Sequence, residues 1–136
     1  MKTNRQYLVG GKRMIELGSS RSTSDTDYMV FRPETDDLFI HDEANDIDYI
    51  NAATGGFYGE VWNLIDEAGE ATAQAMMEMK AYALVQHYQN RNFRKAIDTE
   101  YDMKVLAIEH GIKDFNIAAR HMTAGQVTEI KSIINN

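Results

Sequence analysis

The chain has 136 residues, of which 43% are hydrophobic and 26% are charged, with one proline and no cysteine. This length and composition predict a single globular domain over residues 1–136, and they exclude disulfide scaffolds, thiolate metal sites and thiol catalysis. No apolar run reaches the roughly 18–20 residues that a membrane span needs, and residues 1–17 lack the apolar core of a signal peptide. We therefore expect a cytoplasmic protein with no membrane partner.

Negative charge is concentrated in the middle of the chain. The net charge is −7, and residues 23–79 hold fourteen acidic side chains against one basic side chain. Such a segment is either a solvated face or a site for a divalent cation, since hard cations bind clustered carboxylates. Binding to duplex DNA is not expected, because neutralising phosphates requires a basic patch.

Short apolar runs rich in Tyr, Phe, Ile and Val alternate with turn-forming residues through residue 52. This pattern predicts four or five strands. The runs cover residues 7–11, 14–17, 27–31, 38–41 and 47–51. Gly10, Gly11 and Lys12 lack the spacing of a phosphate-binding P-loop, so they predict a hairpin turn between the first two runs.

After Gly56 the apolar spacing becomes helical, which predicts about four α-helices over residues 57–136. One of them ends at Gly111, which is suited to a left-handed C-cap. The last begins at Thr123, which forms a T-x-x-Q capping box with Gln126. Because strands and helices are segregated, we expect an α+β fold with a small mixed sheet (residues 1–56) and a helical part (residues 57–136).

Asp27 is the first residue of the third apolar run, and Asp25 precedes it with one residue between them. On a strand both carboxylates project from one face, where they repel each other unless a cation lies between them. Mg²⁺ or Mn²⁺ fits this arrangement, with Asp48 in the later run "IDYIN" as the third ligand. His41, Asp42 and Asp46 are weaker candidates.

Gly18 and Ser19 follow the run at residues 14–17, which is predicted to be a strand. Glycine at the end of a strand allows a phosphate to approach the backbone closely, and the Ser19 hydroxyl can contact a phosphate oxygen. Arg21 could bind the same anion through its guanidinium group. The residues thus predict a phosphate site beside a metal site.

The stretch "ELGSSRSTSDTDYMVF" resembles the DNA polymerase β-like nucleotidyltransferase superfamily. The signature of that superfamily is an apolar strand, Gly-Ser or Gly-Gly, a short segment, Asp-x-Asp opening a second strand, and a third acid on a later strand. Five residues separate Ser19 from Asp25, which is fewer than the family normally has. The resemblance covers roughly residues 14–51, where "SDTDYMV" is similar to minimal nucleotidyltransferases of the antitoxin and aminoglycoside-modifying kinds. Further along the chain, "DTEYDMKVLAIEHG" loosely resembles a helix of abortive-infection type nucleotidyltransferases.

The resemblance implies transfer of a nucleoside monophosphate from a nucleoside triphosphate to an acceptor hydroxyl. Asp25, Asp27 and Asp48 would hold Mg²⁺ or Mn²⁺, and Gly18, Ser19 and Arg21 would contact the phosphates. The acceptor could be a protein side chain, an RNA end or a small molecule. Two alternatives stay open: a non-catalytic binding or regulatory protein of the same fold, such as an antitoxin-like partner, and an acidic segment that is only solvated surface.

Overall fold

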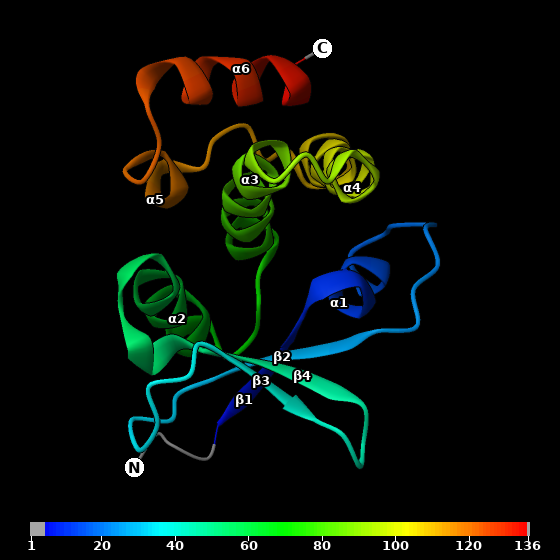
Figure 1. The fold of residues 1–136 in the computed structure, drawn as a ribbon. Helices are drawn as coiled ribbons and strands as arrows, with labels where there is room; N and C mark the ends of the chain where they lie inside the picture. Colours follow the sequence, from blue (N-terminus) through cyan, green and yellow to red (C-terminus); the bar gives the residue numbers. More distant parts are fainter. Residues whose placement is uncertain (1–4, 136) are drawn as a thin grey trace. The chain divides into compact units, whose positions relative to one another are not determined.

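The structure is a computed structural model that describes residues 5–135 (Figure 1). It divides into two compact units, one that runs to Thr72 and one that starts at Ala73. The strands are β1 (Gln6–Val9), β2 (Thr26–Val30), β3 (Phe39–Asp42) and β4 (Ile47–Asn51). The helices are α1 (Gly10–Glu16), the 3₁₀ turn η1 (Ala52–Thr54), α2 (Gly56–Ala68), α3 (Ala73–Gln89), α4 (Phe93–His110), α5 (Asn116–Ala119) and α6 (Ala124–Ile134).

The four described strands form one mixed sheet in the order β1-β2-β4-β3. β1 is antiparallel to β2, β2 is parallel to β4, and β3 is antiparallel to β4. The α+β class and the small mixed sheet are therefore confirmed. The unit boundary follows α2, so this helix belongs with the sheet, whereas the sequence grouped it with the helical part. The expectation of one domain stays a prediction.

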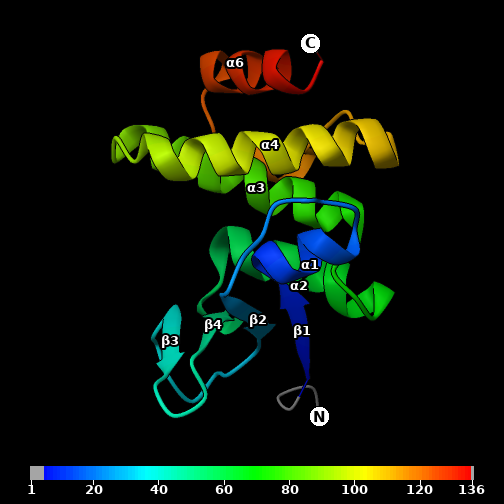
Figure 2. The ribbon, with the colours of Figure 1, turned by 90° about the vertical axis from the view of Figure 1, so that its right-hand side faces the viewer.

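Helices α1 and α2 lie on the same face of the sheet, as Figures 1 and 2 both show. Alternation along the strands points Tyr7, Met29 and Phe31 toward that face. The ring of Trp62 in α2 lies 5.4 Å from the ring of Tyr7 and 5.7 Å from that of Phe31, centroid to centroid. Val9 and Met29 are fully buried there. This apolar layer fixes the strands on which the candidate site is built.

Asn51, the last residue of β4, organises the loop between β2 and β3. Its side chain is fully buried, and its Oδ1 accepts hydrogen bonds from the backbone N–H of Arg32 (2.9 Å) and Ala53 (3.1 Å). Its Nδ2 donates to three loop carbonyls, those of Arg32 (2.9 Å), Thr35 (3.4 Å) and Asp37 (3.2 Å). One amide therefore satisfies loop groups that would otherwise need water.

Residues 14–17 form no strand: they belong to helix α1 and its C-cap, so the strand prediction was wrong. The amide of Ser19 donates to the carbonyl of Met14 (2.9 Å), and the amide of Gly18 donates to that of Ile15 (3.1 Å). Gly18 has φ 114°, and these two bonds are those of a Schellman C-cap. Arg13 also pairs with Glu16 one turn later, at 2.8 Å. A glycine after an apolar run marks a helix end as well as a strand end.

The second unit consists of the described helices α3 to α6. An ion pair joins the first two, with Lys80 Nζ, which is partly exposed, 2.9 Å from Oδ2 of the fully buried Asp102. Gly111 is left-handed at the end of α4, and the Thr123–Gln126 capping box opens α6, so both of these predictions are confirmed. Five helices, rather than about four, follow the sheet in the described chain.

Candidate functional site

Asp27 and Asp48 are direct neighbours on the two parallel strands at the centre of the sheet. The register of β2 and β4 pairs them, so their side chains project from the same face. Adjacent strands lie about 4.8 Å apart, which brings the two carboxylates within reach of a single cation. The structure thus brings together two of the three predicted ligands.

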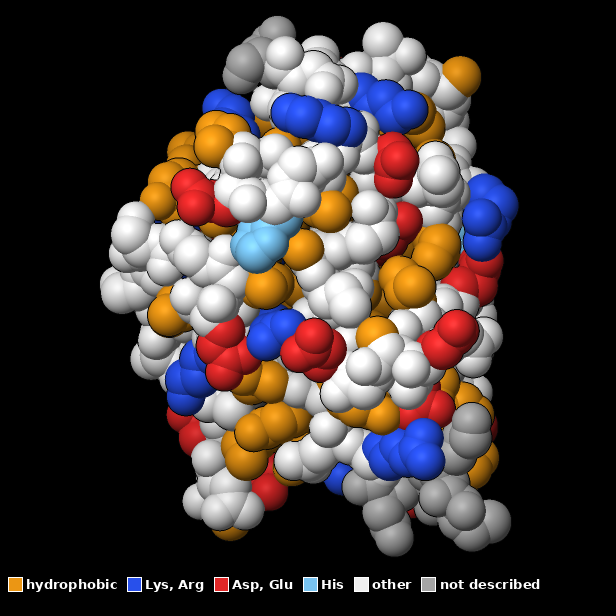
Figure 3. Space-filling view, turned by 180° about the vertical axis from the view of Figure 1, so that it is seen from behind, with side chains coloured by type: hydrophobic (Ala, Val, Ile, Leu, Met, Phe, Trp, Pro, Cys, Tyr) orange, Lys and Arg blue, Asp and Glu red, His pale blue; other side chains and the backbone are white. Residues whose placement is uncertain are grey.

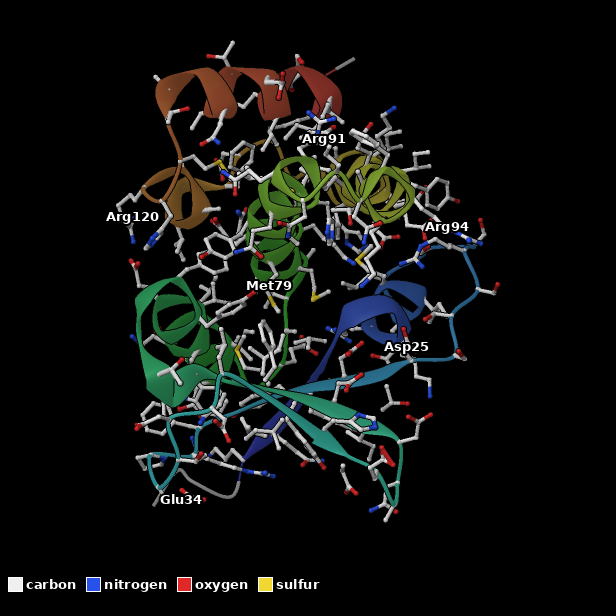
Figure 4. The ribbon with its side chains drawn as sticks, viewed as in Figure 1. Asp25, Glu34, Met79, Arg91, Arg94 and Arg120 are labelled. Carbon is white, nitrogen blue, oxygen red and sulfur yellow. The ribbon has the colours of Figure 1, made fainter. Side chains whose placement is uncertain are left out.

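Asp25 lies on the segment that leads into β2, one residue before the strand begins (Figure 4). Its side chain is exposed. Within residues 5–135 no group of three or more His, Asp or Glu side chains is arranged to hold a metal ion. The observed site is a pair of carboxylates, and the role of Asp25 as a further ligand stays a prediction.

Gly10 follows β1 and lies against Asp27, and the next residue, Gly11, lies against Thr23. Val9 pairs with Asp27 in the sheet, and Gly10 follows with φ +69°. A Cβ on Gly10 would lie 2.3 Å from Asp27 Oδ2, and one on Gly11 would lie 2.8 Å from the side chain of Thr23. No side chain fits at either position without movement of its neighbours, and at Gly10 the backbone itself lies against the carboxylate of Asp27.

The hairpin turn predicted at Gly10–Gly11 was wrong, because the chain passes there directly from β1 into α1. Lys12 in the first turn of that helix donates a hydrogen bond from Nζ to the hydroxyl of Thr26. The positively charged side chain of Lys12 therefore lies beside the start of β2. The sequence feature that could have indicated this arrangement is an apolar strand followed directly by Gly10, Gly11 and Lys12.

Gly18 and Ser19 are engaged in ending α1. Their amides donate to helix carbonyls, and the approach of a phosphate to the backbone at Gly18 stays a prediction. The buried Ser19 hydroxyl accepts a hydrogen bond from the backbone N–H of Arg21 (3.2 Å). Contacts of the Ser19 hydroxyl and of Arg21 with a phosphate stay predictions.

His41 on β3 lies next to Asp48, so Asp27, Asp48 and His41 form a row across three neighbouring strands. It is the register partner of Asp48, and its Nδ1 lies 2.7 Å from Asp48 Oδ1. This hydrogen bond, with added attraction from Asp48, Glu43 and Asp46, raises the pKa of His41 above its ordinary value of 6.5. The sequence ranked His41 below the aspartates because only the β3–β4 register shows that it contacts one of them.

These side chains line a pocket of about 330 Å³ on the sheet. Its wall is formed by Asp27, Phe39, Ile40, His41, Asp48, Tyr49 and Ile50. The volume is at the small end of the range for ligand pockets. Carboxylates lie at one end of the pocket, and Phe39 and Ile50, which pair with each other, lie at the other.

Charge is mixed on the side of the molecule drawn in Figure 3, where acidic and basic side chains lie next to one another. Among residues 5–135, every helix is too short or too polar to cross a bilayer.

Comparison with protein-family models, with curated proteins and with solved structures found no match for this chain.

Proposed function

We propose that this protein is a metal-dependent nucleotidyltransferase whose phosphate-binding backbone is Gly10–Gly11 rather than Gly18–Ser19. The observation that carries the proposal is the meeting of Asp27 with Asp48 in register, directly against Gly10. An apolar strand, then Gly-Gly, then Asp-x-Asp and a later strand with a single acid is the order of the superfamily signature. Thirteen residues now separate Gly11 from Asp25, in place of the five after Ser19.

The donor set suits a hard divalent cation. Asp27 and Asp48 offer only oxygen atoms, and Mg²⁺ is typically held by one or two carboxylates together with substrate phosphates. Asp25 is available as a third carboxylate on the segment before β2. A bound Mg²⁺ would neutralise charge on the phosphates. Lys12 adds a positive charge from the chain on the side of Gly11.

In the proposed reaction, an acceptor hydroxyl attacks the α-phosphorus of a nucleoside triphosphate. A new P–O bond forms, the bond between the α-phosphorus and the bridging oxygen breaks, and pyrophosphate leaves with the electron pair. Asp48 takes the hydroxyl proton as general base. His41 binds one oxygen of Asp48, which orients the carboxylate and leaves its second oxygen for this role.

The second candidate is a non-catalytic binding protein with the same site. It is favoured by the direct contact between His41 and Asp48, because the imidazole occupies one oxygen of the carboxylate that the enzyme would use as general base. Such a protein would bind a nucleotide with Mg²⁺ and transfer nothing. For the enzyme, the acceptor class is open between a protein side chain, an RNA end and a small molecule.

Two measurements test the proposal. We expect ATP or GTP with Mg²⁺ to raise the melting temperature of the wild type but not of Asp27→Asn or Asp48→Asn, with Asp98→Asn on an exposed face of α4 as the matched control. Incubation with labelled triphosphate and cell extract then separates the candidates. Label on a macromolecule or a small molecule of the extract that depends on Asp27 supports the enzyme, and a thermal shift without transfer to either supports the binding protein. If no triphosphate shifts the wild type, both candidates are wrong.

A further inference from the structure

Phe39 is a solvent-exposed aromatic side chain beside the candidate site. It is 65% exposed, although it lies on the same face of the sheet as the buried Met29. Other large apolar side chains are exposed in the described chain, such as Phe93 and Ile108. Phe39 differs from them because it lines the same pocket as Asp27 and Asp48.

The position of Phe39 relative to the carboxylates follows from the sheet. Phe39 and His41 are two residues apart on β3, so they share a face and lie about 7 Å apart along the strand. Their register partners on β4 are Ile50 and Asp48. The pocket therefore has an aromatic end and a carboxylate end, separated by two strand positions.

The ring of Phe39 is held from one side. Tyr58 in α2 contacts it edge to face, with centroids 6.3 Å apart and an angle of 79° between the rings. This contact limits the rotation of the ring while most of its surface stays exposed. A flat, partly fixed apolar surface is suited to stacking against a planar ring of a ligand.

We propose that Phe39 is the stacking platform for the base of the nucleoside triphosphate, an inference that rests on the function proposed above. In a nucleotide the base is joined to the phosphates through one ribose, so a single ligand can reach both ends of this pocket. A planar acceptor would need a second molecule to occupy the carboxylate end. Because every base has a π-face, stacking on Phe39 adds affinity for all four bases and selects none of them.

Calorimetric titration with two probes tests the proposal. α,β-Methylene ATP carries the base, and tripolyphosphate lacks both base and ribose; each is titrated with Mg²⁺. We expect Phe39→Ala to weaken binding of α,β-methylene ATP by about 5- to 100-fold and to leave tripolyphosphate unchanged. Phe39→Trp retains or strengthens nucleotide binding. Phe93→Ala, which removes an exposed phenylalanine in the second unit, changes neither probe.

The outcomes separate the two proposals. If the wild type binds neither probe, the proposed function fails and the role of Phe39 fails with it. If the wild type binds both probes equally tightly, or Phe39→Ala weakens both to the same extent, base stacking is overturned and the carboxylate site stands. Because Phe39 is mostly exposed, its truncation leaves the core intact, and an unchanged circular dichroism melt verifies this.

Discussion

Replacing Asn51 with alanine removes the amide that holds the loop between β2 and β3, and we expect a large loss of stability. The side chain is fully buried, and it accepts from two backbone N–H groups and donates to three carbonyls. Its two amide protons can make two good hydrogen bonds, which gives about four effective bonds in all. At roughly 0.5–1.5 kcal/mol each, their loss costs about 2–6 kcal/mol.

Water can reach part of the loop in the variant, so we expect the loss to be about 3 kcal/mol. At about 4 °C per kcal/mol for a unit of this size, the melting temperature falls by about 12 °C. Urea unfolding followed through Trp62 measures the loss, because the single tryptophan is buried against the same sheet. Asn51→Asp, which sets a carboxylate against the three carbonyls, is expected to be at least as damaging at pH 7.

Asn63→Ala is the matched control, since Asn63 is exposed on α2 in the same unit. Alanine is the better helix former, so this variant keeps or slightly raises the stability. A loss below about 0.5 kcal/mol for Asn51→Ala, the level of ordinary surface substitutions, would refute the reasoning. It would mean that water replaces every bond that the amide makes.

Three further changes test other parts of the structure. Gly10→Ala is expected to cost about 1–3 kcal/mol and to displace the carboxylate of Asp27, because φ is +69° and the added Cβ would lie 2.3 Å from Oδ2; thermal melts and Mg²⁺-nucleotide binding both measure this. Because the pKa of His41 is raised, its contribution to stability is complete below pH 6.5 and is lost as the pH rises through the folded-state pKa. The loss of stability caused by His41→Asn is therefore expected to be larger at acidic pH than at alkaline pH, and NMR titration of the ring measures the pKa. Lys80→Met removes the ammonium group that lies 2.9 Å from the carboxylate of Asp102, which is 0% exposed, and is expected to cost about 3–5 kcal/mol in urea unfolding.

Each of these changes has a control. Gly56→Ala carries the same backbone strain at φ +62° with open space around the new Cβ, so a loss equal to that of Gly10→Ala would contradict the contact argument. Asp48→Asn returns the pKa of His41 toward 6.5, and an unchanged titration midpoint would show that Asp48 is not the cause. For Lys80, the double variant with Asp102→Leu recovers most of the stability; if it does not, the loss is not one of unpaired charge.

Long and strongly patterned segments could be predicted from the sequence. β4 occupies residues 47–51 as predicted, because Ile, Tyr and Ile there have no competing helical spacing. The caps at Gly111 and Thr123 were also predicted correctly, since a left-handed glycine and a capping box are local features that tertiary contacts rarely override. These elements account for the correct α+β class.

The seven-residue helix α1 could not be distinguished from a strand. A run of four residues with three apolar side chains fits both periods, and the glycine that follows it suits both a strand end and a helix C-cap. Because residues 14–17 were predicted to be a strand, the phosphate site was expected at Gly18, whereas the site proposed here at Gly10 follows from the observed passage of β1 into α1. The pairing of Asp27 with Asp48 was expected from their residue types, but the contact of His41 with Asp48 depends on the β3–β4 register, which a single sequence does not determine.

The parallel pairing of β2 with β4 also has a kinetic consequence. The β3–β4 hairpin joins Asp42 to Ile47, five positions apart, whereas β2 meets β4 only when Thr26 reaches Ile47, 21 positions away. Closing the longer loop loses more chain entropy, so we expect the hairpin to form first and to dock on β2 later. His41 and Asp48 would then be in contact before the pairing of β2 with β4 brings Asp27 next to Asp48. In stopped-flow refolding, ligand binding at the carboxylates would appear with the last phase, and binding in an earlier phase would contradict this order.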